Sequence, residues 1–306
     1  MAVKQSKQTA QTKCGFVAII GAPNAGKSTL LNRIIGEKIS IVTHKPQTTR
    51  TRLRGVHVSG STQVVFVDTP GIFEAKGRLE KAMVKAAWGA LKEVDEIVFV
   101  IDSVRGLNPQ VKEIFKRLKQ DHRQVTLVFN KVDIIAREEL LILTTEAMDT
   151  GVVRDVFMIS AKTGDGVDGL LDYVAKRMPE GIWMYPEDQL TDMSERFLAA
   201  EETREALFKQ LNQELPYQLT VITDKWEEFE NGDLKLYQTV YVQKENHKRI
   251  ILGKGGGKIK EIGTAARCAL SEMFGRKVHL TLYVKVNSTW AEKAGFYQEM
   301  GLDFKV

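Results

Sequence analysis

The sequence predicts an α/β fold, with a mixed and mostly parallel sheet covered by helices on both faces, followed by a smaller α+β domain. Three observations support this prediction. The segment GAPNAGKS at residues 21–28 fits the phosphate-loop pattern G-x-x-x-x-G-K-[ST]. Strand-like apolar runs alternate with helical patterns over residues 14–178. A different order, α-β-β-α-α-β, follows over residues 192–306.

The phosphate loop lies between a predicted strand and a predicted helix. Residues 16–20 are apolar and β-prone, and leucines and isoleucines recur at helical spacing from residue 30 until Gly36 ends the helix. Gly21 and Gly26 allow a sharp turn whose N–H groups point at a bound anion. Lys27 would reach the β- and γ-phosphates, and the Ser28 hydroxyl would hold Mg²⁺. This segment therefore predicts a nucleoside triphosphate site.

The remaining elements of the first domain follow in order. Strands are expected at residues 54–59 and 63–67, which form a hairpin, and then at 97–101, 125–129 and 156–159. Helical patterns cover residues 79–92, 109–118, 138–148 and 167–177. Such alternation favours parallel strands, and the nucleotide is then expected at their carboxyl ends.

Three short segments follow predicted strands and match parts of a guanine nucleotide. DTPG at residues 68–71 offers Asp68 to the Mg²⁺ shell and the Gly71 amide to a γ-phosphate. NKVD at residues 130–133 offers the Asp133 carboxylate to the N1–H and amino group of guanine, which adenine lacks as a pair. SAK at residues 160–162 offers the Ala161 amide to guanine O6. The expected nucleotide-binding residues are Gly21, Ala22, Pro23, Asn24, Ala25, Gly26, Lys27, Ser28, Thr29, Asp68, Thr69, Pro70, Gly71, Asn130, Lys131, Asp133, Ser160, Ala161 and Lys162.

These motifs resemble the translation-factor-like class of P-loop GTPases, and KPQTTR at residues 45–50 narrows the resemblance to the bacterial Era family over nearly the whole chain. By that resemblance, the segment is the first switch, and a threonine in it coordinates Mg²⁺ only when the γ-phosphate is present. The family's pattern favours Thr49, although spacing alone does not separate it from Thr48. The implied Mg²⁺ ligands are Ser28, Thr49 and Asp68, and the implied catalytic residues are Lys27, Thr49 and Gly71.

Residues 179–191 contain Pro179, Gly181 and Pro186, and are interpreted as an ordered linker. Asp192 and Glu195 then resemble a capping box for a helix whose mostly apolar stripe runs through residues 197–215. Strands at residues 219–221 and 234–236, continued by the alternating Val240 and Val242, are joined through Asn231-Gly232, which favours a type I′ turn.

A short helix at residues 247–252, the turn GKGG, a helix at residues 258–274 and a strand from Val278 to Val286 complete the chain. The order resembles a type II KH domain, in which a G-x-x-G loop lies in a groove for single-stranded nucleic acid. A second phosphate loop is disfavoured because no K-[ST] follows. The expected RNA-binding residues are Gly253, Lys254, Gly255, Gly256, Lys258 and Lys260.

Composition agrees with this interpretation. The 44 lysines and arginines outnumber the 39 acidic residues, a mild excess that is compatible with nucleic acid but common on solvated surfaces. The two cysteines, Cys14 and Cys268, predict neither a disulfide framework nor a zinc site. Residues 1–13 read as a disordered polar tail without the apolar core of a signal peptide, and a truncated organellar transit peptide is the alternative. No apolar run reaches the length of a membrane helix.

The position after DTPG, where Ras-like GTPases carry a water-positioning glutamine, is Ile72. We therefore expect slow intrinsic hydrolysis that relies on Mg²⁺, Lys27 and backbone amides, with K⁺ held by Asn24 and switch carbonyls as a further candidate. Two alternatives stay open: an RNA-binding module with a structural, non-hydrolysing nucleotide site, and a P-loop kinase, against which the NKVD segment argues.

The family resemblance implies a GTP/GDP switch that binds 16S ribosomal RNA near its 3′ end and assists maturation of the small ribosomal subunit. It further implies a cytoplasmic protein with loose association with the inner membrane, and we expect a monomer. The sequence by itself does not specify the RNA.

Overall fold

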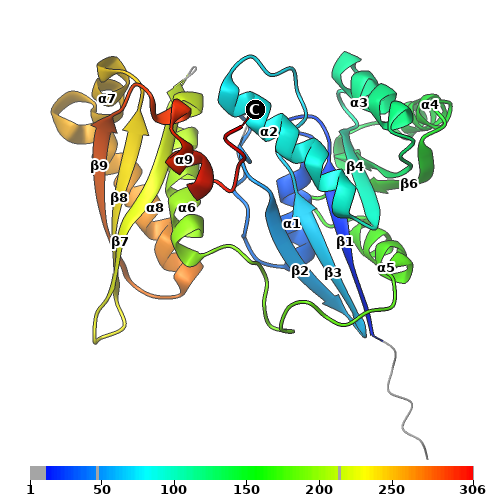
Figure 1. The fold of residues 1–306 in the computed structure, drawn as a ribbon, viewed down its shortest axis with the longest axis horizontal. Helices are drawn as coiled ribbons and strands as arrows, with labels where there is room; N and C mark the ends of the chain where they lie inside the picture. The colour runs from blue at the N-terminus through cyan, green and yellow to red at the C-terminus, as the bar shows by residue number, and fades with distance from the viewer. Residues whose placement is uncertain (1–11, 46–47, 213–214, 306) are drawn as a thin grey trace, which may run out of the picture.

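The computed structural model describes residues 12–45, 48–212 and 215–305, which form two sheet-based units side by side (Figure 1). The first unit holds a six-stranded sheet in the order β2-β3-β1-β4-β5-β6. Only the β2–β3 pair is antiparallel, which confirms the predicted mixed and mostly parallel sheet. Its strands are β1 (Lys13–Ile20), β2 (Leu53–Ser59), β3 (Thr62–Asp68), β4 (Glu96–Asp102), β5 (Val125–Asn130) and β6 (Val153–Ile159).

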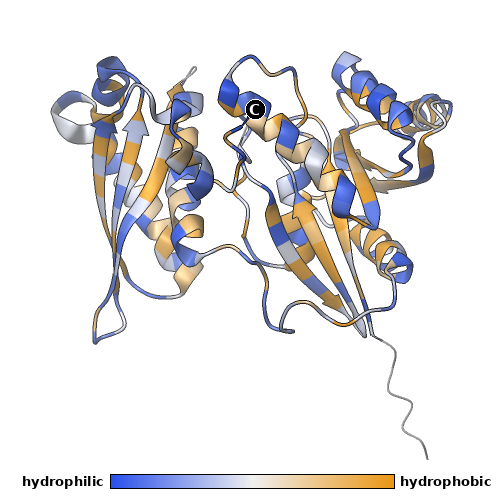
Figure 2. Ribbon diagram, viewed as in Figure 1, coloured by the Kyte–Doolittle hydropathy of each residue, from blue (hydrophilic) through white to orange (hydrophobic). Residues whose placement is uncertain are grey.

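Helices cover both faces of this sheet, and the alternation of side chains along β1 explains how. Val17 and Ile19 pack with α1 (Lys27–Ile35) and α5 (Val167–Arg177) on one face. Ala18 and Ile20 belong to the core on the opposite face. That core also contains residues of α2 (Arg78–Ala90), η1 (Leu91–Glu93), α3 (Pro109–Gln120) and α4 (Arg137–Met148). Figure 2 shows the central strands as the most continuously hydrophobic part of the chain, as expected for a sheet buried on both faces.

The first strand begins earlier than predicted. Lys13 pairs with Thr62 of β3 and Thr12 exchanges hydrogen bonds with Gly181, so the expected disordered tail over residues 1–13 is wrong at its last two residues. Residues 1–11 of that predicted tail lie outside the described residues.

The segment between the two units runs along the free edge of β2. The Val56 amide donates to the Leu190 carbonyl at 2.9 Å, and Arg54 pairs with Asp192 at 2.8 Å. The helix that follows is capped by Ser194, whose hydroxyl accepts from the Phe197 amide. The predicted capping box at Asp192 is therefore wrong, because its carboxylate is engaged by Arg54 two residues before the cap.

The second unit is a three-stranded sheet in the order β7-β8-β9, with β7–β8 antiparallel and β8–β9 parallel. Residues of three of its helices, α6, α7 and α8, share one apolar core with these strands. The element order is the one that the KH resemblance implies. The elements are α6 (Glu195–Gln210), η3 (Leu215–Gln218), β7 (Leu219–Glu228), β8 (Leu234–Val242), α7 (Glu245–Leu252), η4 (Lys254–Gly256), α8 (Gly257–Phe274) and β9 (Val278–Val286).

Two local predictions in this unit are wrong. A type I′ turn needs positive φ at both central residues, but of Asn231 and Gly232 only Gly232 has it, at 84°. The hairpin closes instead through Phe229, whose carbonyl accepts from the Gly232 amide and whose amide donates to Asp233. The helix predicted to carry a stripe as far as residue 215 ends at Gln210.

The C-terminal segment forms two short elements that the sequence analysis did not predict, η5 (Trp290–Glu292) and α9 (Ala294–Glu299). Trp290 and Tyr297 are fully buried in a cluster with Ala82 and Met83 of α2. Figure 1 shows this red segment between α2 and the second sheet. The C-terminal segment therefore packs against both units, since Tyr241 of β8 also contacts this cluster. Among the described residues, no helix combines the length and apolarity needed to cross a bilayer.

Candidate nucleotide site and RNA groove

The phosphate loop is shaped by backbone conformations that side chains would block. Gly26 has φ of 100°, and a Cβ there would lie 2.0 Å from the Asn130 amide nitrogen. Gly21 has φ of 152°, and a Cβ there would lie 2.3 Å from the Val100 carbonyl oxygen. Between them, Asn24 also adopts positive φ, at 64°, which asparagine tolerates better than most residues. Gly26 directly precedes α1, so the loop opens onto the amino terminus of that helix.

Lys27 is folded back across this loop. Its ammonium donates to the Gly21 carbonyl at 3.2 Å and the Ala22 carbonyl at 3.0 Å. Burial lowers the pKa of Lys27 to about 8, with the Asp68 carboxylate acting in the opposite direction. A buried cation that donates to two backbone carbonyls is a group that an incoming phosphate would stabilise strongly.

Four oxygen-bearing side chains meet beside the loop. The Ser28 hydroxyl donates to Asp68 Oδ2 at 2.7 Å and lies 2.8 Å from the Thr49 hydroxyl. Ser40, which the sequence analysis missed, donates to the same carboxylate oxygen at 3.3 Å. Asp68 is fully buried, its other oxygen has no hydrogen-bond partner, and burial raises its pKa. Hard oxygens around an orphaned carboxylate oxygen fit a Mg²⁺ ion.

The two adjacent threonines of the switch segment point to different partners. Thr49 faces Ser28 and Asp68 as described. The Thr48 hydroxyl instead lies 2.9 Å from the Thr43 hydroxyl and donates to the Lys45 carbonyl at 2.8 Å, so it is engaged within its own loop. Residues 46 and 47 of the predicted switch lie outside the described residues.

The segment after β3 packs against the phosphate loop. A Cβ at Gly71 would lie 2.9 Å from the backbone nitrogen of Pro23, so no other residue fits there. The Ile72 amide donates to the Gly21 carbonyl at 3.0 Å, while its side chain is buried in the core under α2 and α3. The Thr69 hydroxyl donates to the Ile19 carbonyl at 2.8 Å. The segment thus offers backbone amides but no side chain able to polarise water.

In the two motifs expected to bind the base, NKVD and SAK, one side chain joins two loops and others are exposed. We call the Asn130 side chain, which joins the phosphate loop to the loop after β6, the Asn130 strut. Asn130 is 2% exposed; its amide donates to the Ala25 carbonyl at 2.8 Å and its oxygen accepts from the Ala161 amide at 2.9 Å. Asp133 is exposed. Lys131 has φ of 68° and pairs with Asp102 at 2.5 Å, which fixes its stem beside the loop. Asn130 therefore joins the phosphate loop to the loop after β6.

The remaining residues of that loop are positioned by short local bonds. The buried Ser160 hydroxyl accepts a hydrogen bond from the Thr163 amide at 3.2 Å. The carbonyl of the exposed Lys162 accepts one from the Arg33 guanidinium of α1. Arg33 also donates to the Ala161 carbonyl at 3.3 Å. Arg33 was not among the predicted residues, because a single arginine at the end of a helix carries no motif.

The G-x-x-G turn of the second unit has the backbone that only glycine adopts easily. Gly253, Gly255 and Gly256 have φ of 69°, 59° and 77°. A Cβ at Gly253 would lie 2.9 Å from the backbone nitrogen of Lys258. Because three of the four residues in the turn between α7 and α8 are glycine, only Lys254 carries a side chain there, and a polyanion backbone can approach closely.

The lysines around this turn are not equivalent. Lys254 and Lys260 are exposed, whereas Lys258 is half-buried and pairs with Glu261 at 3.1 Å. Lys254 and Lys260 therefore provide positive charge without a carboxylate partner among the described residues.

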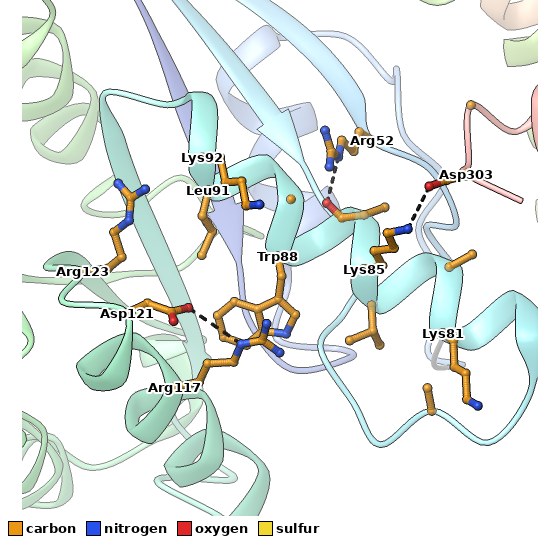
Figure 3. Close-up of a pocket in the computed structure, with 16 residues that line it drawn as sticks. Arg52, Lys81, Lys85, Trp88, Leu91, Lys92, Arg117, Asp121, Arg123 and Asp303 are labelled. Carbon is orange, nitrogen blue, oxygen red and sulfur yellow. Dashed lines mark hydrogen bonds and ion pairs between the residues drawn. The ribbon is translucent and has the colours of Figure 1, made fainter. Parts of the chain in front are cut away.

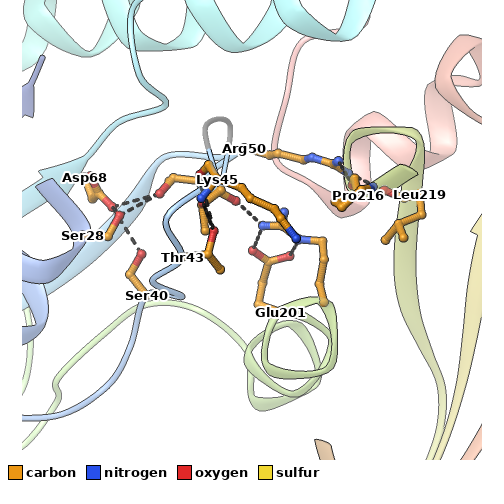
Figure 4. A network of polar contacts seen from close by, with 12 residues as sticks. Ser28, Ser40, Thr43, Lys45, Arg50, Asp68, Glu201, Pro216 and Leu219 are labelled. Atoms are coloured by element: carbon orange, nitrogen blue, oxygen red, sulfur yellow. Dashed lines mark hydrogen bonds and ion pairs between the residues drawn. The ribbon is translucent and has the colours of Figure 1, made fainter. Parts of the chain in front are cut away.

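The switch segment is also held by the second unit (Figure 4). Arg50 is 3% exposed and donates to the carbonyls of Leu219 at 2.6 Å, Tyr217 at 3.1 Å and Pro216 at 3.3 Å. The buried Arg204 of α6 donates to the Thr48 carbonyl and pairs with Glu201.

Two lysines of the first unit extend this contact. The Lys45 ammonium donates to the Phe208 and Leu211 carbonyls, and Lys38 pairs with Glu202 and Glu205 at 2.7 Å each. This contact was not predicted, although charged residues inside a predicted apolar helix were a signal for it.

Comparisons with known proteins find relatives of both units. Residues 16–131 match a family model described as 50S ribosome-binding GTPase, and residues 214–291 match the KH domain model. The GTPase Era of Rhizobium meliloti is 52% identical over 293 residues, covering 96% of this chain and 94% of that protein. The GTPase Era of Caulobacter vibrioides is 47% identical over 312 residues, covering 97% and 99%.

Solved structures give the same result. A crystal structure of Era in complex with MgGDPNP and nucleotides 1506-1542 of 16S ribosomal RNA matches with a TM-score of 0.89 and 38% identity over 95% of this chain and 99% of that one. A single-residue variant of Aquifex aeolicus Era bound to GDP.AlF4- matches with the same TM-score, identity and coverage. With identities near one half over almost the full length of the curated relatives, the chain belongs to the Era family of GTPases.

Proposed function

We propose that this chain is a GTP-hydrolysing switch that binds 16S ribosomal RNA near its 3′ end through the G-x-x-G groove and assists assembly of the small ribosomal subunit. The observation that carries the proposal is the placement of three consecutive switch residues. Thr49 faces the Ser28 and Asp68 oxygens, while its neighbours Thr48 and Arg50 are held by the KH unit. A change at the γ-phosphate can therefore alter the contact with the RNA-binding unit.

In this proposal, GTP and Mg²⁺ occupy the site around the phosphate loop. Ser28, Thr49 and Asp68 would hold Mg²⁺, which supplies positive charge between the phosphates. Lys27 would form an ion pair with the phosphates, and the Gly71 amide would donate a hydrogen bond to the γ-phosphate when it is present. The support is the orphaned Asp68 oxygen, the buried lysine and the glycines that a Cβ would block. Two solved relatives, one with MgGDPNP and one with GDP.AlF4-, agree with this ligand set.

The base would be selected by the loops after β5 and β6. Asp133 is exposed and would accept hydrogen bonds from guanine, while the stem of Lys131 lies fixed beside it. The Ala161 amide already donates to Asn130, so its contact with guanine O6 would have to be shared. Asn130 acts on the nucleotide through the two loops that it joins.

Slow hydrolysis follows from the buried Ile72, which leaves stabilisation of the transition state to fixed charges and amides. We propose K⁺ as one of these charges. The Asn24 amide group donates at 2.9 Å to the carbonyl of His44, the residue just before the switch segment, which leaves the Asn24 side-chain oxygen for a cation beside that carbonyl.

The RNA contact is proposed for the turn between α7 and α8. Exposed Lys254 and Lys260 and the three left-handed glycines support it, together with the 16S ribosomal RNA bound in the solved relative. The division into a G domain at residues 14–178, a linker at 179–191 and a KH domain at 192–306 belongs to the proposal, as do a monomeric, cytoplasmic protein and a peripheral contact with the inner membrane.

The proposal is tested by replacing Lys254 and Gly255 with Asp. Carboxylates would face phosphates and the turn would be strained, so binding of a single-stranded RNA copy of the 16S 3′ end should be abolished while GTP affinity survives. The matched control replaces Lys277 and Gly232 with Asp, because Gly232 is also an open glycine with positive φ and belongs to the connection between β7 and β8. Figure 1 shows this hairpin at the end of the sheet away from α7. Circular dichroism checks the folding of both variants.

Three outcomes would contradict the proposal. Undiminished RNA affinity in the groove variant would move the RNA site elsewhere. Negligible GTP turnover by the wild type, even with RNA added, would favour a structural nucleotide site. ATP use with transfer to an acceptor would favour a kinase.

A further inference from the structure

A strongly basic cavity of about 870 Å³ lies on the G domain, and none of the nucleotide-site residues lines it (Figure 3). Its walls come from α2, from the end of α3 and from the C-terminal segment around Gly301. Six cationic side chains line it, against two carboxylates. They are Arg52, Lys81, Lys85, Lys92, Arg117 and Arg123, with Asp121 and Asp303.

Half of these cations have a partner in the protein. Arg52 donates to the Ala86 carbonyl at 2.8 Å, and Lys85 pairs with Asp303 at 2.8 Å. The Arg117 guanidinium lies over the Trp88 ring, 4.2 Å from its centre, in a cation–π contact. Arg117 also forms a long ion pair of 3.8 Å with Asp121.

The other three cations, Lys81, Lys92 and Arg123, have no carboxylate within ion-pair distance among the residues that the structure places. Lys81 and Lys92 are also exposed. The cavity therefore keeps an uncompensated positive charge that an anionic ligand would neutralise.

The spacing of the lysines indicates a ligand with repeated charges. Lys81, Lys85 and Lys92 lie four and seven residues apart along α2 and its 3-10 extension, which places them on one face at intervals of about 6 and 10 Å along the axis. One phosphate group cannot contact all three. A phosphodiester backbone, with one charge per nucleotide, can contact them in turn.

The shape of the site argues against a lipid surface as the ligand. An amphipathic helix that lies in a bilayer surface presents exposed apolar side chains next to its cationic face. None of the large exposed hydrophobic side chains of the described residues lines this cavity. The cations lie in a hollow, which suits a strand or groove edge of RNA better than a flat membrane.

We propose that this basic cavity binds the phosphate backbone of RNA, as a second contact in addition to the G-x-x-G groove. The inference rests on the proposed function, because it requires that the chain binds RNA at all. The cavity would take the part of the RNA that extends beyond the single strand in the KH groove. It places one RNA contact on α2, which begins seven residues after Gly71.

The test compares two RNAs and two charge-reversed variants. One RNA is a single strand that fills only the KH groove, and the other carries the same strand extended by a hairpin. The variant Lys81→Glu with Lys92→Glu removes the uncompensated lysines of the cavity. The control, Lys119→Glu with Lys176→Glu, reverses two other exposed lysines of the same domain that do not line it. Equal GTP affinity in both variants confirms that the domain is folded.

We expect the cavity variant to lose tenfold or more in affinity for the extended RNA and nothing for the short one. The slope of log affinity against log salt should fall by about 1.4 to 1.8, the value for two phosphate contacts. Equal affinity of the cavity and control variants for the extended RNA would overturn the inference. So would a loss of binding to vesicles of anionic lipid with RNA binding unchanged. If the wild type binds neither RNA, the proposed function itself fails.

Discussion

Asn130→Ala should uncouple the phosphate loop from the loop that follows β6. The asparagine side chain makes the only hydrogen bonds, among the described residues, that join these two loops directly: one to the Ala25 carbonyl and one from the Ala161 amide. Ala25 and Ala161 are 1% and 2% exposed, so water does not replace the lost partner without rearrangement. Each buried backbone group left unpaired costs about 1–3 kcal/mol, which gives about 2–6 kcal/mol in total.

The assay is denaturant unfolding of the nucleotide-free protein, followed by titration with GTP and GDP. The Asn130 side chain bonds to Ala25 and Ala161 and not to the DTPG segment that would contact the γ-phosphate. The affinities for GTP and GDP should therefore fall by the same factor. Asn108→Ala is the matched control: Asn108 caps α3 by accepting from the Gln110 and Val111 amides, and its loss should cost about 1 kcal/mol without affecting nucleotide binding.

A second variant separates the two hydrogen bonds of the Asn130 side chain. Asn130→Asp keeps an acceptor for the Ala161 amide but presents a carboxylate oxygen to the Ala25 carbonyl, so it should be at least as destabilising as the alanine variant. The reasoning is refuted if Asn130→Ala behaves like Asn108→Ala in both stability and nucleotide affinity.

Three further predictions concern the nucleotide site. Asp133→Asn should weaken GTP binding by about 2–4 kcal/mol and favour xanthosine triphosphate, and unchanged GTP affinity in a titration would contradict the base assignment. K⁺ should raise the hydrolysis rate over Na⁺ at matched ionic strength, and Asn24→Ala should remove the difference; equal wild-type rates in the two salts would exclude the cation site. The pKa of Lys27 falls from 10.5 to about 8 on burial, so below pH 8 the lysine is charged in both folded and unfolded states and the full cost of burial applies. Between pH 8 and 10.5 the folded state loses its proton first, and the nucleotide-free protein should gain about 3 kcal/mol of stability. This gain should be absent in Lys27→Met, whereas the same pH dependence in that variant would refute the assignment.

The elements and the phosphate loop were predictable because their causes are local. The period of apolar residues defined the strands and helices of both units, and the strand from Val278 to Val286 and the helix from Val167 to Arg177 agree with the structure at both ends. In the phosphate loop, the need for glycine at positive φ is a property of the loop backbone itself, so the pattern of residues carries it.

Features that depend on two distant segments were predicted poorly. Asp192 looked like a helix cap, but Arg54, 138 residues away, takes its carboxylate. Asn130 was predicted as a nucleotide-binding residue, and the motif did not indicate that its side chain bonds to backbone groups of two other loops. The residues near Asp192 and Asn130 in the sequence do not indicate which distant residues these side chains bond to.

The contact between the two units was decided by tertiary structure alone. By itself the sequence determined a GTP site, a KH-like groove and the elements that carry them, because glycine conformations, helical periods and strand ends are encoded within a few residues. It did not determine that Arg50 reaches the carbonyls before β7, or that Trp290 and Tyr297 pack on α2. Those contacts join surfaces from different domains, and their energy depends on burying both partners together, which no single segment specifies.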